Sequence, residues 1–330
     1  MNRIEKAVRD PSLALRYLLS PVERCSVAAR LAVFSRYPVG TNVFTRDWDL
    51  LLVLDCCRVD AIRAVADEYD FITDVGSITS VGSATSEWVS QTFHSKHRDE
   101  VAMTAYLSGN GHSREVLEEG FEPEYNRDAG FAPTAWGTVE ASELGYLEHV
   151  WEYANYFESG EGKAYVDPEL MTDRTIEFYR EHGDEYDRVI SHYIPPHPPY
   201  IGHAHRDGRD DLYDYEWSPW DYMRNGGHFE TVWEVYLSEV RSALDAIEVL
   251  LSNVDAEKVV ITADHGEAMG EHGLYSHPEG ALHPKVKRVP WVETTATDER
   301  TRSPNVIAEV GETTERADLE EHLQALGYAD

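Results

Sequence analysis

Two short apolar runs in this chain each end in an aspartate. Leu50–Leu54 is apolar throughout and is followed by Asp55, and Val259–Ala263 is followed by Asp264 and His265. A strand that is apolar at every position is typical of a sheet covered on both faces. In such sheets, ligands gather where the parallel strands end. The pattern predicts an α/β fold with functional groups at one edge of a central sheet.

Segments of strand and helix character alternate along the chain. We expect strands over Leu50–Leu54, Val101–Leu107, Arg188–Tyr193, Lys258–Ala263 and Val289–Val292, and helices over Val59–Ala66, Thr172–Tyr179 and Thr231–Leu251. This alternation predicts a single α/β domain with a mostly parallel central sheet and helices on both faces. The stretch Leu212–Gly227, rich in Tyr, Trp, Asp and Asn, shows no period and is interpreted as an insertion loop near the site.

The two ends of the chain differ from its centre. Residues 1–46 hold more basic than acidic residues and are predicted to form a basic N-terminal extension of short helices. The extension either packs on the domain or makes weak contact with a membrane surface of anionic lipid. The catalytic domain is assigned to residues 47–300, and residues 301–330 to a polar linker and a C-terminal helix.

The net charge of -32, from 61 acidic against 29 basic residues, constrains the partners and the environment. Nucleic acid is an improbable partner because there is no broad basic face. Self-repulsion of this size is screened at molar salt, so the composition favours a halophilic protein over a merely acidic one. The absence of a signal sequence or a long apolar span favours a cytoplasmic protein, peripheral to the membrane at most. The three cysteines are too few for a disulfide framework.

The acids at the two strand ends are candidate metal ligands. Asp55, Asp264 and His265 offer two carboxylates and an imidazole, a normal ligand set for Zn²⁺ or Mn²⁺. Ca²⁺ and Mg²⁺ are the alternatives. An acid at one strand end is weak evidence, whereas two of them, one joined to a histidine, give a stronger prediction of a divalent metal site.

The segment 262–277, TADHGEAMGEHGLYSH, is the most informative in the chain. It resembles the C-terminal metal motif of sulfatases and related enzymes of the alkaline phosphatase superfamily, and most of all that of bacterial phosphoethanolamine transferases. In that family an Asp-His pair binds metal, and a His thirteen residues after the Asp faces the substrate or a second metal. The resemblance implies these roles for Asp264, His265 and His277.

Further family motifs follow in order. Residues 51–60, LLVLDCCRVD, resemble the first-strand motif, whose acid (here Asp55) is a metal ligand. Residues 81–88, VGSATSEW, are similar to the nucleophile turn of phosphoethanolamine transferases and lipoteichoic acid synthases. This resemblance makes Thr85 both nucleophile and metal ligand, with Ser83 in reserve. Residues 192–200, HYIPPHPPY, resemble the central His-Pro motif, which makes His197 a substrate-side residue. Residues 288–292 resemble the last-strand motif.

The resemblance implies a hydrolase or transferase for phosphate or sulfate esters, with lipid-linked or glycan-linked substrates among the candidates. Thr85 would be activated by the metal, and His197 and His277 would stabilise the transferred group, protonate the leaving oxygen or complete a weaker second metal site. His192 is an outside candidate for that second site. Arg58 is assigned equally to substrate binding and to a salt bridge. His112 is expected at the surface.

The chain departs from the sulfatase pattern at the nucleophile turn. Sulfatases of the formylglycine type carry a Cys or Ser followed two residues later by Pro and then by Arg, and the turn around Thr85 has no such context. The leading interpretation is phosphoryl transfer through Thr85. A sulfuric ester hydrolase with unmodified Thr85 is the first alternative. A degenerate, non-catalytic binding module is the second, and the presence of all six site residues together argues against it.

Overall fold

The computed structural model describes residues 11–123, 126, 132–153, 155–156, 164–209 and 211–304. Its centre is a seven-stranded sheet of short strands. The strands in spatial order are β2 (Gly76–Thr79), β11 (Arg288–Ala296), β8 (Ala256–Thr262), β1 (Leu50–Leu54), β7 (Arg188–Tyr193), β3 (Thr104–Ser108) and β4 (Tyr146–His149). Strands β8, β1, β7, β3 and β4 are parallel to their neighbours in this series, whereas β11 runs antiparallel to both β8 and β2.

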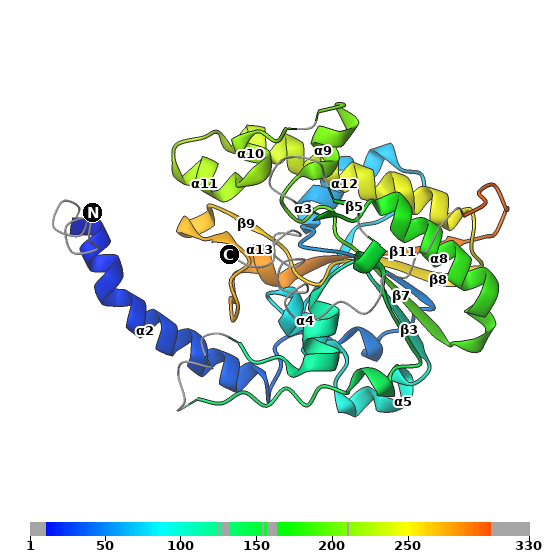
Figure 1. The fold of residues 1–330 in the computed structure, drawn as a ribbon, viewed down its shortest axis with the longest axis horizontal. Helices are drawn as coiled ribbons and strands as arrows, with labels where there is room; N and C mark the ends of the chain where they lie inside the picture. The colour runs from blue at the N-terminus through cyan, green and yellow to red at the C-terminus, as the bar shows by residue number, and fades with distance from the viewer. Residues whose placement is uncertain are drawn as a thin grey trace.

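Helices cover both faces of this sheet (Figure 1). The α-helices are α2 (Pro11–Phe34), α3 (Val59–Val65), α4 (Thr85–Thr92), α5 (Arg98–Val101), α6 (His112–Arg114), α8 (Pro168–His182), α9 (Ile201–Arg206), α10 (Asp214–Trp217), α11 (Pro219–Arg224), α12 (Phe229–Leu251) and α13 (Pro284–Lys287). Two small hairpins pair β9 (Ala268–Met269) with β10 (Tyr275–Ser276) and β5 (Asn155–Tyr156) with β6 (Ala164–Tyr165). Shorter turns of helix are η1 (Val43–Thr45), η2 (Ala66–Glu68), η3 (Ser95–His97), η4 (Glu115–Gly120), η5 (Ala141–Glu143), η6 (Val150–Tyr153), η7 (Gly183–Glu185) and η8 (Glu271–Gly273).

Strand β1 shows why the sheet needs two covering layers. All five of its residues are buried. Leu50, Leu52 and Leu54 pack with residues of α3, α8 and α12 on one face, whereas Leu51 and Val53 pack with residues of α4 and η4 on the other. Because side chains alternate along a strand, an apolar residue at every position supplies a core to each face. The prediction of a mostly parallel α/β sheet with helices on both faces is confirmed.

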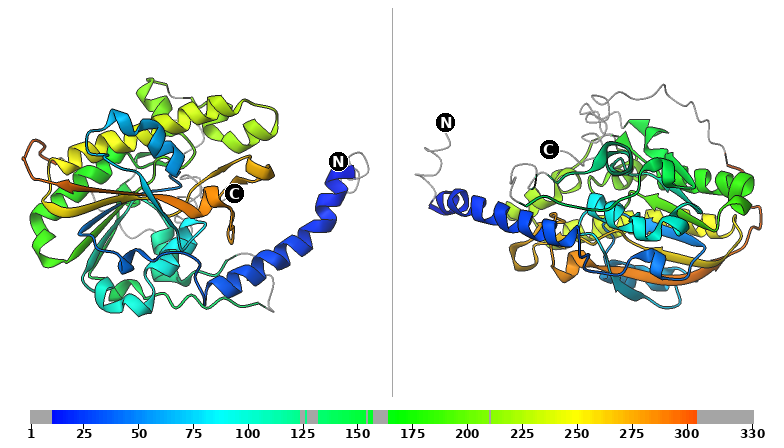
Figure 2. Two further views of the ribbon diagram at one scale, coloured as in Figure 1. Left: turned by 180° about the vertical axis from the view of Figure 1, so that it is seen from behind. Right: turned by 90° about the horizontal axis from the view of Figure 1, so that it is seen from below.

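The structure of the N-terminal extension differs from the sequence prediction. We expected short helices, but a single helix runs from Pro11 to Phe34 and passes through Pro21. Its first half stands away from the body, in views from opposite sides (Figures 1 and 2). Among the described helices, none is long and apolar enough to cross a bilayer. The predicted C-terminal helix lies outside the described residues, so the division at residues 46 and 300 stays a prediction, as does the cytoplasmic location.

Two further predictions are corrected. The stretch expected as an insertion loop contains the short helices α10 and α11, whose four and six residues are too few to show a period. Pro219 at the start of α11 supplies a φ suited to the first helical turn. The strand expected from Val101 begins at Thr104, because Val101 ends α5.

Candidate active site

The strand order explains how distant residues meet. Strands β8, β1 and β7 are parallel neighbours, so their carboxyl ends share one edge of the sheet. Asp264 follows β8, Asp55 follows β1, and His192 lies near the end of β7. All three side chains are fully buried. The edge predicted from the two apolar runs is therefore where the candidate ligands collect.

Asp55, Asp264 and His265 form a compact group of candidate metal ligands. One ligand atom from each lies within 4.8 Å of the others. His265 Nε2 is 3.5 Å from Asp55 Oδ1 and 3.3 Å from Asp264 Oδ2. His265 Nδ1 donates to the carbonyl oxygen of Gly266 at 3.0 Å, so the unprotonated Nε2 faces the carboxylates. Two carboxylates and an oriented neutral imidazole fit a divalent cation.

The pKa of the His265 imidazole supports the same state. Burial lowers this pKa well below its usual range, and the neighbouring His277 lowers it further. Burial likewise lowers the pKa of His192 to about 4. Both rings are therefore neutral at physiological pH, which a nitrogen ligand must be.

Thr85 projects into this group from the start of α4. Its Oγ1 donates to Asp264 Oδ2 at 2.8 Å and lies 3.3 Å from His265 Nε2. The preceding turn is tight: a β-carbon at Gly82 would lie 2.4 Å from the backbone nitrogen of Trp88. Only glycine fits there, so Gly82 lets the chain fold back and present Thr85 at the helix N-terminus.

His277 lies next to His265, and His197 lies next to His277. The His277 ring centroid is 4.3 Å from that of His265 and 5.3 Å from that of His197. His277 Nδ1 donates to Glu267 Oε2 at 2.9 Å. Burial opposes protonation of His277, but the Glu267 carboxylate outweighs it and raises the pKa of this imidazole. For His197, burial and the nearby His277 lower the pKa instead.

Several residues near the site were not predicted to belong to it. Asn110 follows β3, and its Nδ2 donates to Asp55 Oδ2 at 2.7 Å. Tyr106 holds His192 Nδ1 through a hydrogen bond of 2.9 Å. His112, expected at the surface, is only partly exposed and lies close enough to act electrostatically on His192, His197 and His265. The strand order places these residues in the site, and only the polar ending of the β3 run could have indicated Asn110.

Other candidates have structural partners. Arg58 donates to Asp60 at 2.7 and 2.9 Å and pairs with Glu271 at 2.9 Å, so of its two assignments the structure shows the salt bridge. Ser83 Oγ donates to Glu87 Oε1 at 3.0 Å. His203 pairs with the buried Glu216 at 2.8 Å. These contacts hold the segments around the site together.

Comparisons with known proteins identify structural neighbours. No family model and no curated protein sequence matches the chain. It is similar in structure to the soluble domain of lipooligosaccharide phosphoethanolamine transferase A from Neisseria meningitidis, with 17% identity, a TM-score of 0.46, and coverage of 77% of this chain and 78% of that one. For the intact integral membrane protein, EptA, identity is 15% and the TM-score 0.47, covering 81% of this chain and only 51% of that one. This chain thus spans about half of intact EptA.

A putative sulfatase from Bacteroides thetaiotaomicron is similar too, at 13% identity and a TM-score of 0.43, covering 86% of this chain and 71% of that one. The structural neighbours thus include phosphoethanolamine transferases and a putative sulfatase, each at low sequence identity.

Proposed function

We propose that this protein is a metal-dependent phosphate-ester hydrolase or phosphoryl transferase with Thr85 as its nucleophile. One observation carries the proposal: the Thr85 hydroxyl lies 2.8 Å from Asp264 and 3.3 Å from His265, within the group of candidate metal ligands. A hydroxyl is a weak nucleophile at neutral pH until a metal or a base activates it. Its burial among metal ligands supports a catalytic role over a structural one.

Asp55, Asp264 and His265 would hold the ion, and Zn²⁺ or Mn²⁺ suits their mixed oxygen and nitrogen donors. When bound, a divalent ion lowers the pKa of a neighbouring hydroxyl and neutralises charge on the ester. Asn110 keeps one oxygen of Asp55 in a hydrogen bond, which fixes the rotation of that carboxylate. The protein thus supplies an oriented set of ligands.

Thr85 Oγ1 would form the bond to phosphorus as the ester P–O bond breaks. The Thr85 proton would leave through Asp264, which already accepts it in a hydrogen bond. His277, whose pKa is raised, would give a proton to the departing oxygen, while His197 contacts the transferred group. Water or an acceptor alcohol would then attack the phosphothreonine and give its proton to His277, while Asp264 returns a proton to the released Thr85 oxygen. Positioning and charge stabilisation account for most of this catalysis.

We favour phosphate over sulfate esters for two reasons, the charge of the ester and the residues around Thr85. Phosphate esters carry more negative charge, so a protonated His277 gains more from contacting them. The turn around Thr85 lacks the Pro-Arg context that formylglycine formation needs. Substrates linked to a lipid or a glycan are compatible with the proposal, and the acceptor is left to experiment.

The test compares aryl phosphate monoesters, phosphate diesters and aryl sulfates with the metal-loaded protein. Thr85→Ala should abolish turnover, whereas Thr85→Ser should keep a measurable rate because it retains a hydroxyl. Ser90→Ala is the matched control, since Ser90 lies on the same helix and its hydroxyl donates only to the backbone of Ser86. Mass spectrometry after a rapid quench should find the phosphoryl group on Thr85. Efficient sulfate cleavage with inert phosphates would reverse the substrate assignment, and a modified Ser83 would move the nucleophile.

A further inference from the structure

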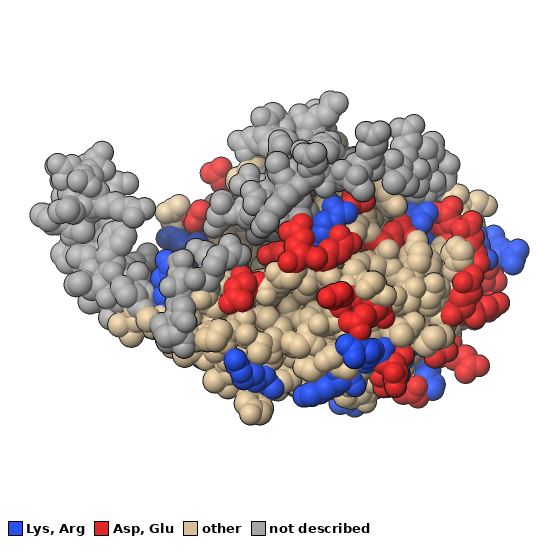
Figure 3. All heavy atoms as spheres, turned by 60° about the horizontal axis from the view of Figure 1, so that its bottom comes forward, with Lys and Arg blue, Asp and Glu red and all other residues tan. Residues whose placement is uncertain are grey.

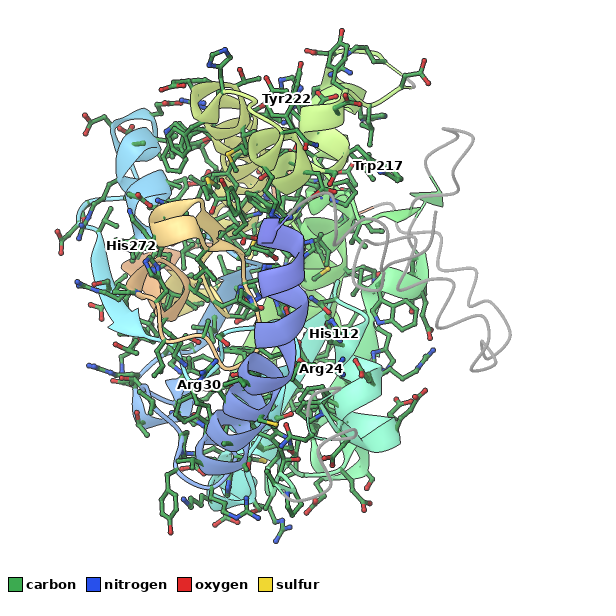
Figure 4. All side chains as sticks on the ribbon, turned by 90° about the vertical axis from the view of Figure 1, so that its left-hand side faces the viewer. Arg24, Arg30, His112, Trp217, Tyr222 and His272 are labelled. Atoms are coloured by element: carbon green, nitrogen blue, oxygen red, sulfur yellow. The ribbon has the colours of Figure 1, made fainter. Side chains whose placement is uncertain are left out.

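Helix α2 touches the body through its second half. The carbonyl of Phe34, the last residue of the helix, accepts from Gln91 Nε2 at 3.0 Å, and just beyond the helix Arg36 Nη1 donates to the carbonyl of Pro133 at 2.9 Å. Val27 and Leu31 are buried against Trp136. Figure 4 labels Arg24 and Arg30 on this helix, which crosses the face of the molecule that also presents His112 and Trp217. The second half of α2 therefore packs against the body of the protein.

One contact of α2 reaches the segment that follows His277. Arg30 Nε donates to the carbonyl of Gly280 at 3.0 Å. Gly280 has a φ of +68°, and a β-carbon there would lie 3.5 Å from the Leu31 side chain. The loop 278–281 is thus pressed against α2 in a backbone conformation that glycine adopts without strain.

The other side of the same loop holds the nucleophile turn. The Gly280 N–H donates to Glu87 Oε1 at 2.5 Å, and the Ala281 N–H donates to Ser83 Oγ at 3.0 Å. Ser83 Oγ also lies 3.1 Å from the carbonyl of Pro278, which is an alternative acceptor for its single proton. Glu87 and Ser83 flank Thr85 on either side in the sequence. The loop therefore connects α2 to the turn that presents Thr85.

The two residues of the nucleophile turn that make this connection are buried. Ser83 is fully buried and Glu87 is 2% exposed. Burial raises the pKa of Glu87, while hydrogen bonds from Gly280 and Ser83 and the nearby Lys287 oppose that rise. Removing the hydrogen-bond donors of a buried carboxyl group destabilises the fold. We therefore expect the loop and α4 to move together.

We propose that Arg30 is a positioning residue, through which α2 holds loop 278–281 against α4 and fixes both Thr85 and His277 beside the metal ligands. The proposal rests on the proposed function. In this proposal α2 contributes to the geometry of the active site. Arg30 acts indirectly, because it donates to Gly280 and Ser26 and not to the candidate ligands or Thr85.

The test compares Arg30→Ala, Arg30→Lys and Arg36→Ala in the full chain. Arg36 is the matched control because it also ties α2 to the body but bonds to Pro133 and not to loop 278–281. We expect Arg30→Ala to lower kcat for an aryl phosphate by about 10-fold to 100-fold with KM and metal content little changed, as for a small misplacement of reacting groups. Arg30→Lys should recover most of the rate, since an ammonium can donate to the Gly280 carbonyl. Arg36→Ala should stay within about twofold of the parent.

Hydrogen–deuterium exchange separates this proposal from the proposed function. The amides of Gly280 and Ala281 should exchange faster in Arg30→Ala than in Arg36→Ala at equal melting temperature. Equal exchange and equal kcat in these two variants would overturn the positioning role. If the parent protein turns over no phosphate ester, the proposed function fails, and the exchange comparison alone decides whether Arg30 holds the loop.

Discussion

The backbone N–H of Cys56 donates a hydrogen bond of 3.1 Å to Oδ1 of Asp264, 208 positions away in the sequence. Cys56 has a φ of 54°, a conformation that few residues other than glycine adopt. The same Oδ1 accepts from the backbone of His265 at 2.8 Å, while Oδ2 receives Thr85. The unusual backbone at Cys56 therefore helps to orient the Asp264 carboxylate before any ion arrives.

Replacing Asp264 should empty the metal site. Asp264→Asn keeps the shape of the side chain but removes the negative charge, so we expect most of the bound metal and activity to be lost. Metal content by mass spectrometry and turnover of an aryl phosphate check this. Glu257→Gln, an exposed change on the strand that precedes Asp264, should leave both unchanged. Full metal occupancy and full turnover in Asp264→Asn would refute the assignment.

Asn110 should control metal affinity without binding the ion. Asn110→Ala removes the hydrogen bond that orients Asp55, and the loss of such an outer contact typically weakens metal affinity about 10-fold to 100-fold. Competition with a chelating dye measures the change. An unchanged affinity would mean that Asp55 is oriented by other contacts.

Glu239 should make stability depend on pH. Burial raises its pKa from 4.5 to about 7, although Arg206 and the His203 N–H oppose the shift. Between these two values the folded state keeps a proton that the unfolded state has lost, so stability falls as pH rises through this window. At pH 8 the penalty amounts to about 3 kcal/mol.

Glu239→Gln removes this titration. Urea unfolding should show the variant more stable than the parent at pH 8 and nearly equal to it at pH 5. Glu234→Gln, an exposed position on the same helix, serves as the control. The same difference between parent and Glu239→Gln at both pH values would contradict the prediction.

Salt should stabilise the fold. Acidic side chains are spread over the face shown in Figure 3, with basic ones between them, so the repulsion from a charge of -32 is distributed. The melting temperature should rise as sodium chloride increases from about 0.1 M to about 3 M, where screening acts over about 3 Å. A non-ionic osmolyte at matched osmolality is the control, and a flat melting temperature in salt would rule out this adaptation.

The N-terminal extension should bind anionic vesicles in dilute buffer. Residues 1–21 carry Arg3, Lys6, Arg9 and Arg16 and precede the contacts that dock α2 on the body. Co-sedimentation with vesicles containing an anionic lipid should be lost when these residues are removed, and neutral vesicles should bind neither protein. Equal binding of both proteins to anionic vesicles would leave only the packing role of α2.

Elements with a clear pattern of apolar residues were predicted best from the sequence. The bounds of β1 and β7 are as predicted. Strand β1 is apolar throughout because it is buried on both faces, whereas β7 also holds Arg188, Ser191 and His192. Helix α12 begins two residues before the predicted start and ends where predicted. The direction of β11 was not predicted, since a side-chain pattern carries no information about whether a strand runs parallel or antiparallel to its neighbour.

The candidate site was predictable from the two apolar runs that end in acids and from the family resemblance. Thr85, Asp264 and His265 meet as the motifs implied, although their catalytic and metal-binding roles stay predictions. Asn110 and His112 were missed because their place in the site depends on β3 lying next to β7, a contact between residues more than 80 positions apart. Sequence spacing alone does not encode that neighbourhood.

The antiparallel direction of β11 places the end of this strand away from the candidate metal ligands, where a label can be attached. Its last residue, Ala296, pairs with Ala256 at the start of β8, at the edge of the sheet opposite the metal ligands. The chain then bonds to the end of α12, where the Thr297 and Glu299 N–H groups donate to Leu251 and Ser252. A fluorophore attached at the exposed Arg300 would therefore report the unfolding of this end of the sheet, away from the candidate metal ligands.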